Sequence, residues 1–153
     1  MGLFIDLEGL DGCGKTTQTE LLCKRFEKEN ISYKKIKLPD YESDSSILVR
    51  KYLNGDFGKN ANDVNAFAAS VLFAADRFAS YTEKWKKDYL NGTLIFSDRY
   101  TPANALYQMT KLEPEEWDSY RSPSSDMYPQ PLHISVRGRP PQSLSMCQYR
   151  CRR

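Results

Sequence analysis

One glycine-rich segment near the N-terminus limits the possible folds of this chain more than any other feature. Residues 9–16 read GLDGCGKT and fit the pattern G-x-x-x-x-G-K-[ST] of a phosphate-binding loop. Glycine lets such a loop curl so that its backbone N–H groups point at an anion, and the helix that follows adds the positive end of its dipole. A loop of this kind needs a strand before it and a helix after it.

The flanking residues meet this requirement. Residues 3–7 form a short apolar run that predicts a buried strand, and Leu21, Leu22 and Phe26 have helical spacing within residues 17–28. Lys15 could then reach the β- and γ-phosphates of a nucleotide, and the Thr16 hydroxyl could bind Mg²⁺. We therefore predict a nucleoside-triphosphate site rather than an ordinary glycine-rich turn.

Composition is typical of one globular domain. The chain has 153 residues, of which 40% are hydrophobic, and its four cysteines match no zinc-binding pattern. No apolar run reaches membrane-spanning length and no signal peptide is evident, so we expect a cytoplasmic protein with no membrane partner.

The net charge is −3 for residues 1–120 and +5 for residues 121–153. Because the basicity belongs to the last segment alone, we expect no nucleic-acid partner.

The rest of the chain alternates between strand and helix patterns. The predicted elements are strands at residues 31–38 and 93–97 and helices at residues 47–53, 63–89 and 101–111. The order β-α-β-α-α-β-α predicts an α/β fold with a parallel sheet flanked by helices, and residues 31–38 have the pattern of an edge strand. Ligands bind at the carboxyl ends of such strands. The segments that should meet there are residues 9–16, 39–41 and 98–100.

The longest helical pattern, residues 63–89, carries an apolar stripe and two candidate ligand contacts. The stripe runs from Val64 to Ala79 at spacings of three and four and predicts a buried face. Phe73 and Arg77 lie one turn apart on one face, and a ring beside a bidentate donor suits a nucleobase pocket. Taken alone, Phe73 also fits core packing and Arg77 a solvated helix face.

Five short blocks together resemble the thymidylate kinase family. They follow the family order, within a resemblance over about residues 2–120, and read EGLDGCGKTTQ (8–18), LPDY (38–41), FAADR (73–77), DRY (98–100) and NALYQ (104–108). The resemblance implies a P-loop nucleoside-triphosphate hydrolase-like fold. It also implies transfer of the ATP γ-phosphate to dTMP, giving dTDP for dTTP synthesis, with Mg²⁺ present. The alternatives are a deoxynucleoside kinase of the same superfamily and a non-catalytic nucleotide-binding fragment.

The resemblance implies a role for each matching residue. The ATP phosphates would be bound by Gly9, Gly12, Cys13, Gly14, Lys15, Thr16 and Thr17. Mg²⁺ would be held by Thr16 and Asp98, and the catalytic residues would be Lys15, Asp11 and Arg99. The residues in contact with dTMP would be Asp11 at its 3′-hydroxyl side, Tyr41 and Arg99 at its phosphate, Phe73, Arg77 and Asn104 at thymine, and Tyr107 under the sugar. Gln108 matches a common position of the family and would also contact the substrate.

The resemblance ends near Tyr120. Residues 121–153 are rich in serine, proline and arginine, and they fit either a disordered tail or, as we favour, a sequence read out of frame. Within this segment Leu132, Ile134 and Val136 alternate with other residues and could form one short strand, although prolines flank them on both sides.

Family members continue beyond this point with further strands and a lid. Those with glycine at the position of Gly12 take their catalytic arginine from the lid. We therefore expect a fold incomplete at its C-terminus, an exposed edge on the third strand and impaired activity. Family members are commonly homodimers that pack through long helices, and the apolar stripe over residues 64–79 could form such an interface.

Overall fold

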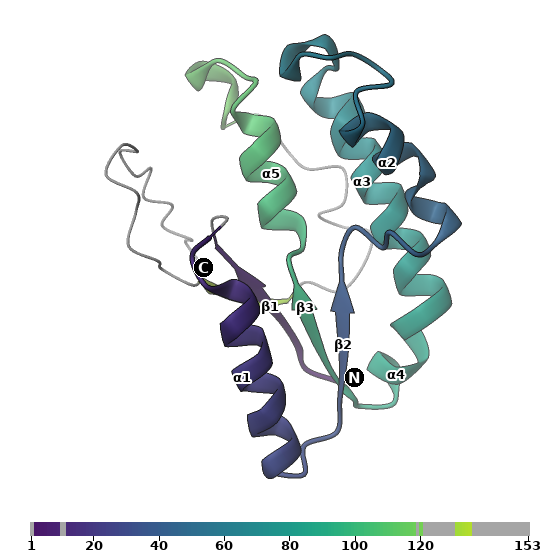
Figure 1. The fold of residues 1–153 in the computed structure, drawn as a ribbon, viewed down its shortest axis with the longest axis vertical. Coiled ribbons are helices and arrows are strands. Elements are labelled where there is room, and N and C mark those ends of the chain that lie inside the picture. Colours follow the sequence, from purple (N-terminus) through teal and green to yellow (C-terminus); the bar gives the residue numbers. More distant parts are fainter. Residues whose placement is uncertain (1, 10–11, 119, 121–130, 136–153) are drawn as a thin grey trace.

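The computed structural model describes residues 2–9, 12–118, 120 and 131–135. These residues form a parallel four-stranded sheet in the order β2-β3-β1-β4, with helices on both faces (Figure 1). The strands are β1 (Phe4–Glu8), β2 (Tyr33–Lys37), β3 (Leu94–Asp98) and β4 (Leu132–Ser135). The predicted α/β class, the parallel sheet and the place of β2 at a sheet edge are confirmed.

The helices lie close to their predicted positions. They are α1 (Lys15–Lys28), α2 (Ile47–Leu53), α3 (Ala66–Ser80), α4 (Lys86–Leu90) and α5 (Thr101–Met109). A π-helical turn at Tyr81–Trp85 joins α3 to α4, so the single helix predicted for residues 63–89 is divided. Within the described ranges, no helix is long and apolar enough to cross a membrane.

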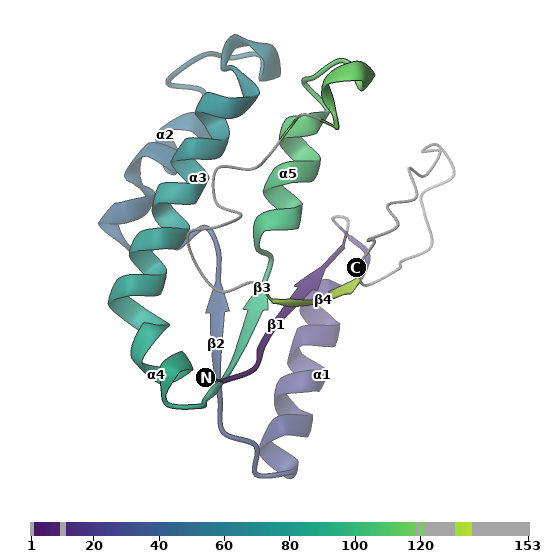
Figure 2. The same cartoon turned by 180° about the vertical axis from the view of Figure 1, so that it is seen from behind.

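Helix α1 and the α3–α4 pair cover opposite faces of the sheet, as the two views in Figures 1 and 2 show. The Phe26 ring of α1 packs edge-on against Phe96 of β3, with ring centroids 5.8 Å apart. On the other face, Trp85 packs against Phe4 at 5.1 Å in a buried cluster that also contains Ile95. Successive residues of β3 therefore contribute to both faces, as strand alternation requires.

The buried face of α3 is not the one predicted. Phe67, Val71 and Phe78 of the apolar stripe are 44%, 52% and 45% exposed. The residues of α3 that are buried are Ala66, Ala69, Ser70, Ala74, Asp76, Arg77 and Ser80. The prediction of a buried apolar stripe is therefore wrong for this chain. The face that α3 turns inward is small and polar, and Asp76 and Arg77 on it line one of the cavities described below.

Two expectations for the third and last strands are also wrong. Strand β3 lies between β2 and β1, with Leu94 opposite Tyr33 and Ile95 opposite Phe4, so neither of its edges is exposed. Residues 132–135, expected in a disordered tail, form β4 and pair with β1. The alternation of Leu132, Ile134 and Val136, which indicated one short strand, therefore describes these residues better than a disordered tail does. The remainder of the segment, residues 121–130 and 136–153, lies outside the described residues.

Candidate active site

Two adjoining cavities lie at the carboxyl edge of the sheet. The loop cavity, of about 550 Å³, lies between the glycine-rich loop and the ends of β2 and β3. The helix cavity, of about 430 Å³, lies between α3, α5 and the segment after β2. Leu38, Pro39, Tyr41 and Arg99 line both, and we call these four residues the shared wall. The three segments predicted to meet at this edge therefore do meet.

The backbone of the glycine-rich loop is shaped for an anion. Gly12 and Gly14 have φ angles of 76° and 91°, in the left-handed region that other residues adopt only with strain. Helix α1 begins directly after its N-cap residue Gly14, which as a glycine has no side chain to bond to the first N–H groups. Its first N–H groups and its dipole thus point at the loop cavity, an arrangement that suits a phosphate.

Three side chains predicted to act on phosphates or metal line the loop cavity. Lys15 is only 7% exposed, and its Nζ donates to the Gly9 carbonyl oxygen at 2.8 Å. Thr16 and Asp98 line the same cavity and offer the oxygen ligands that Mg²⁺ prefers. In the described part of the chain, no three His, Cys, Asp or Glu side chains gather as a metal site.

The remaining residues predicted to bind nucleotide are placed differently. Gly9 contributes the carbonyl that receives Lys15, whereas Cys13 and Thr17 are not among the residues that line the loop cavity. Asp11 lies outside the described residues, so its predicted role at the 3′-hydroxyl stays a prediction.

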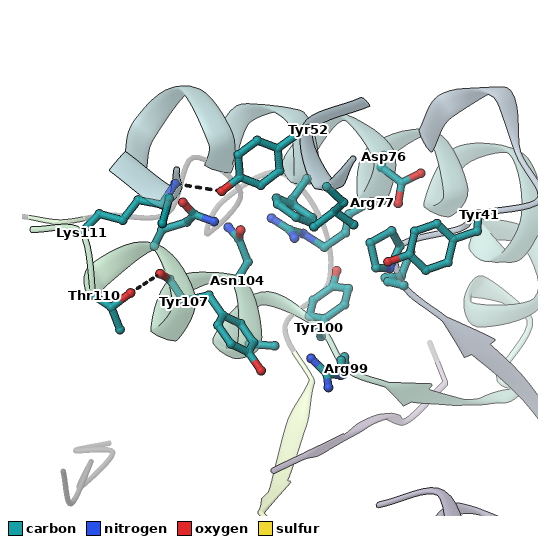
Figure 3. A pocket seen from close by; sticks show the side chains of 17 residues that line it. Tyr41, Tyr52, Asp76, Arg77, Arg99, Tyr100, Asn104, Tyr107, Thr110 and Lys111 are labelled. Carbon is teal, nitrogen blue, oxygen red and sulfur yellow. Dashed lines mark hydrogen bonds between the residues drawn. The ribbon is translucent and has the colours of Figure 1, made fainter. Parts of the chain in front are cut away.

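The helix cavity brings together every described residue predicted to contact the phosphate acceptor. These are Tyr41, Phe73, Arg77, Arg99, Asn104, Tyr107 and Gln108. Figure 3 shows the Arg77 and Asn104 side chains converging from α3 and α5. Arg77 is 3% exposed, so its alternative reading as a solvated helix face is wrong.

Two amide side chains of α5, Asn104 and Gln108, are buried in this cavity. Asn104 is 6% exposed and Gln108 is 3% exposed. Within the described structure, both polar atoms of Asn104 and the Oε1 of Gln108 have no hydrogen-bond partner. A buried polar atom left in this state costs about 1–3 kcal/mol. Such groups therefore suit a ligand that supplies the missing partners.

The aromatic side of the cavity is held by contacts between elements. The half-buried Phe73 ring packs edge-on against Tyr52, with centroids 5.9 Å apart. The Nζ of Lys111 donates to the Tyr52 hydroxyl at 2.8 Å, as drawn in Figure 3. Asp76 accepts hydrogen bonds from the Asp40 backbone N–H at 2.9 Å and from the Ser45 hydroxyl at 2.7 Å. These bonds fix the loop after β2 against α3.

The turn that presents Arg99 has a backbone conformation that the sequence did not predict. Arg99 has a φ of 75°, in the left-handed region, which costs about 1–3 kcal/mol for a residue other than glycine. Its backbone N–H donates to the Leu7 carbonyl at 3.3 Å, and the Ser97 hydroxyl donates to the Arg99 carbonyl at 2.6 Å. The Arg99 guanidinium lies 6.0 Å from the centroid of the Tyr107 ring. The turn thus places Arg99 where it lines both cavities.

Glu8, which sequence reasoning missed, holds this turn from β1. Its Oε1 accepts from the backbone N–H groups of Tyr100 at 2.8 Å and Ala103 at 3.2 Å, and so caps the N-terminus of α5. Burial, with a further contribution from the neighbouring Asp6 carboxylate, raises the pKa of Glu8 to about 8. The sequence signals were its place directly before the glycine-rich loop and at the start of the block of residues 8–18, and neither indicated this role.

Comparison with known proteins gives a consistent result. The family model described as thymidylate kinase matches residues 7–128, so the match runs past the boundary predicted at Tyr120. A probable thymidylate kinase of Thermococcus gammatolerans is 34% identical over 122 residues, which cover 76% of this chain and 57% of that protein. A thymidylate kinase of Bifidobacterium longum is 33% identical over 117 residues, covering 75% and 56%. The chain thus spans a little more than half the length of these relatives.

A solved structure has the same fold. The crystal structure of a thymidylate kinase from Ehrlichia chaffeensis superposes with a TM-score of 0.63 over 90% of this chain and 73% of that one. The sequence identity is 22%, so this similarity concerns the fold alone.

Proposed function

The chain belongs to the thymidylate kinase family, and we propose that it transfers the γ-phosphate of ATP to dTMP, giving dTDP. The observation that best supports this proposal is the shared wall between the two cavities. Phosphoryl transfer needs the two substrates in line and the moving charge neutralised, with little covalent chemistry from the protein. Adjoining cavities can hold donor and acceptor phosphates next to each other.

The loop cavity would bind the phosphates of ATP. The backbone N–H groups around Gly12 and Gly14 and the Lys15 ammonium would face the phosphate oxygens. Thr16 and Asp98 would hold Mg²⁺, which supplies positive charge to the phosphates.

The helix cavity would bind dTMP with its phosphate at the shared wall. Arg99 and Tyr41 would bind that phosphate, since the guanidinium and the phenol hydroxyl are both hydrogen-bond donors at neutral pH. Phe73 would stack on thymine, while Arg77 and Asn104 would face its polar edge. Tyr107 and Gln108 would lie near the sugar. The unpartnered Asn104 amide would gain both a donor and an acceptor from the base.

The alternatives differ in which acceptor they use. A deoxynucleoside kinase would accept thymidine, but the placement of Arg99 and Tyr41 at the shared wall favours an acceptor that already carries a phosphate. A non-catalytic nucleotide-binding protein would bind ATP and phosphorylate nothing. We expect slow turnover from these 153 residues alone, because a loop with glycine at position 12 resembles those that rely on a lid arginine.

Product analysis with γ-labelled ATP and Mg²⁺ separates these possibilities. We expect labelled dTDP from dTMP, formed well below the usual kinase range of about 1–100 s⁻¹. No product is expected from thymidine or from the Lys15→Ala variant. Labelled product from thymidine would favour a deoxynucleoside kinase. ATP binding that depends on Lys15, with no product from either acceptor, would favour a non-catalytic protein.

We also propose that the chain forms a homodimer through the exposed stripe of α3. Phe67, Val71 and Phe78 lie on one side of this helix, and each exposes more than two-fifths of its surface. An apolar face of this kind on a helix suits burial against a second copy.

A further inference from the structure

Lys37 is a charged residue of the loop cavity to which the proposed mechanism gives no role. It is the last residue of β2, its side chain is exposed, and it lines the loop cavity together with Lys15 and Thr16. In the sheet register it lies directly opposite Asp98 of β3. Because the strand order is β2-β3-β1, Lys37 and the glycine-rich loop flank Asp98 from opposite sides.

Strand alternation fixes the direction of the Lys37 side chain. Tyr33, on the same face of β2, donates its hydroxyl to Glu27 of α1 at 3.1 Å. Lys34, on the other face, bonds to Asp88 of α4. Lys37 lies four residues after Tyr33 and therefore projects from the face covered by α1, whose N-terminus carries Lys15.

The charges around the loop cavity are suited to more than one phosphate group. Its charged lining residues are Lys15, Lys37 and Arg99, with Asp98 as the single carboxylate among the described ones. Lys34 and Lys84 each form an ion pair with an aspartate, whereas Lys37 has no ion-pair or hydrogen-bond partner in the described structure. Its position therefore is not explained by a structural salt bridge.

We propose that Lys37 is a third cation of the loop cavity and contacts the phosphoryl group in transfer from the side opposite Lys15. This inference rests on the proposed function and adds a residue to it. The bond that breaks joins the γ-phosphorus to the bridging oxygen of ADP, and the bond that forms joins it to a dTMP phosphate oxygen. Lys37 gives up no proton in this step. It neutralises charge on the equatorial oxygens, and its long, flexible side chain suits a point contact.

Binding of ATP and ADP to the full chain, measured by calorimetry with Mg²⁺, tests the proposal. Lys37→Gln should weaken ATP binding about tenfold and ADP binding by less than about twofold, because only ATP carries the γ-phosphate. Lys35→Gln is the matched control, since Lys35 is exposed on the same face of β2 but lines neither cavity. Lys35→Gln should bind ATP and ADP with affinities within about twofold of those of the wild type. Lys37→Arg should bind ATP within about threefold of the wild type.

Three results would overturn the role of Lys37 alone. These are a Lys37→Gln variant that behaves like Lys35→Gln, an equal loss of ATP and ADP affinity, and a Lys37→Arg variant as weak as Lys37→Gln. A wild-type chain that fails to bind ATP would instead overturn the proposed function, and the role of Lys37 with it. Melting curves of the three variants, all altered at an exposed position, identify any loss of folding.

Discussion

Replacing Glu8 by alanine should destabilise the fold and displace the turn that presents Arg99. The change removes the acceptor of two backbone N–H groups, those of Tyr100 and Ala103. Each buried N–H group left without a partner costs about 1–3 kcal/mol, and loss of a buried carboxyl group offsets part of this cost. We therefore expect Glu8→Ala to lower the free energy of unfolding by about 2–4 kcal/mol.

Glu8→Gln separates hydrogen bonding from charge. The glutamine amide oxygen can accept the same two N–H groups but does not titrate, so Glu8→Gln should be at least as stable as the wild type at pH 6. The pKa of Glu8 is raised from 4.5 to about 8, so between these values the folded chain holds a proton that the unfolded chain has released. The Glu8 contribution to stability is therefore present below pH 4.5 and is lost as pH rises through 8, with a slope of at most about 1.4 kcal/mol per pH unit.

Urea denaturation between pH 5 and pH 9, followed by fluorescence, measures both effects. Trp85 is 1% exposed and reports the loss of the core. The wild type should lose stability relative to Glu8→Gln as pH rises, and Glu8→Ala should be the least stable variant at pH 6. The reasoning is refuted if Glu8→Gln is as unstable as Glu8→Ala at pH 6, or if the wild type and Glu8→Gln show the same pH dependence.

Two further predictions concern the ligand cavity and the exposed helix face. Asn104→Leu removes two buried polar atoms that have no partner among the described residues. It should raise the melting temperature while weakening dTMP binding about tenfold or more in calorimetry, and unchanged dTMP affinity would contradict the role of Asn104. Val71→Glu places a charge on the exposed stripe of α3, so light scattering should show a monomer where the wild type is a dimer. Leu21→Glu, at a similarly exposed position of α1, is the control and should leave the mass of the dimer unchanged. If Val71→Glu also leaves that mass unchanged, the exposed stripe of α3 is not the dimer interface.

The features predicted well from the sequence are those encoded locally. The glycine-rich loop has its strand, its glycines and its helix within residues 3–28, so short-range patterns suffice. Seven of the 17 residues that line the helix cavity were predicted as site residues, because the blocks around Tyr41, Phe73, Asp98 and Asn104 resemble one family. The parallel sheet then brought their side chains to one edge.

The features that were missed depend on contacts between distant segments. The bond from Glu8 to the Tyr100 N–H spans 92 residues, and no local pattern encodes it. The left-handed turn at Arg99 is held by the Leu7 carbonyl and by Ser97 rather than by a glycine. The orientation of α3 was predicted wrongly because its apolar residues are exposed and its buried side carries Asp76 and Arg77. A polar cavity wall reverses the usual relation between hydropathy and burial.

We propose that the helix cavity binds a 5′-monophosphate against the shared wall, next to the ATP site. Calorimetric titration of the wild-type chain with dTMP and, separately, with thymidine tests it most directly. Arg99 and Tyr41 should bind the phosphate through charge-assisted hydrogen bonds, so dTMP should bind at least about tenfold more tightly than thymidine. Equal affinities for the two compounds, or no binding of dTMP, would contradict the claim.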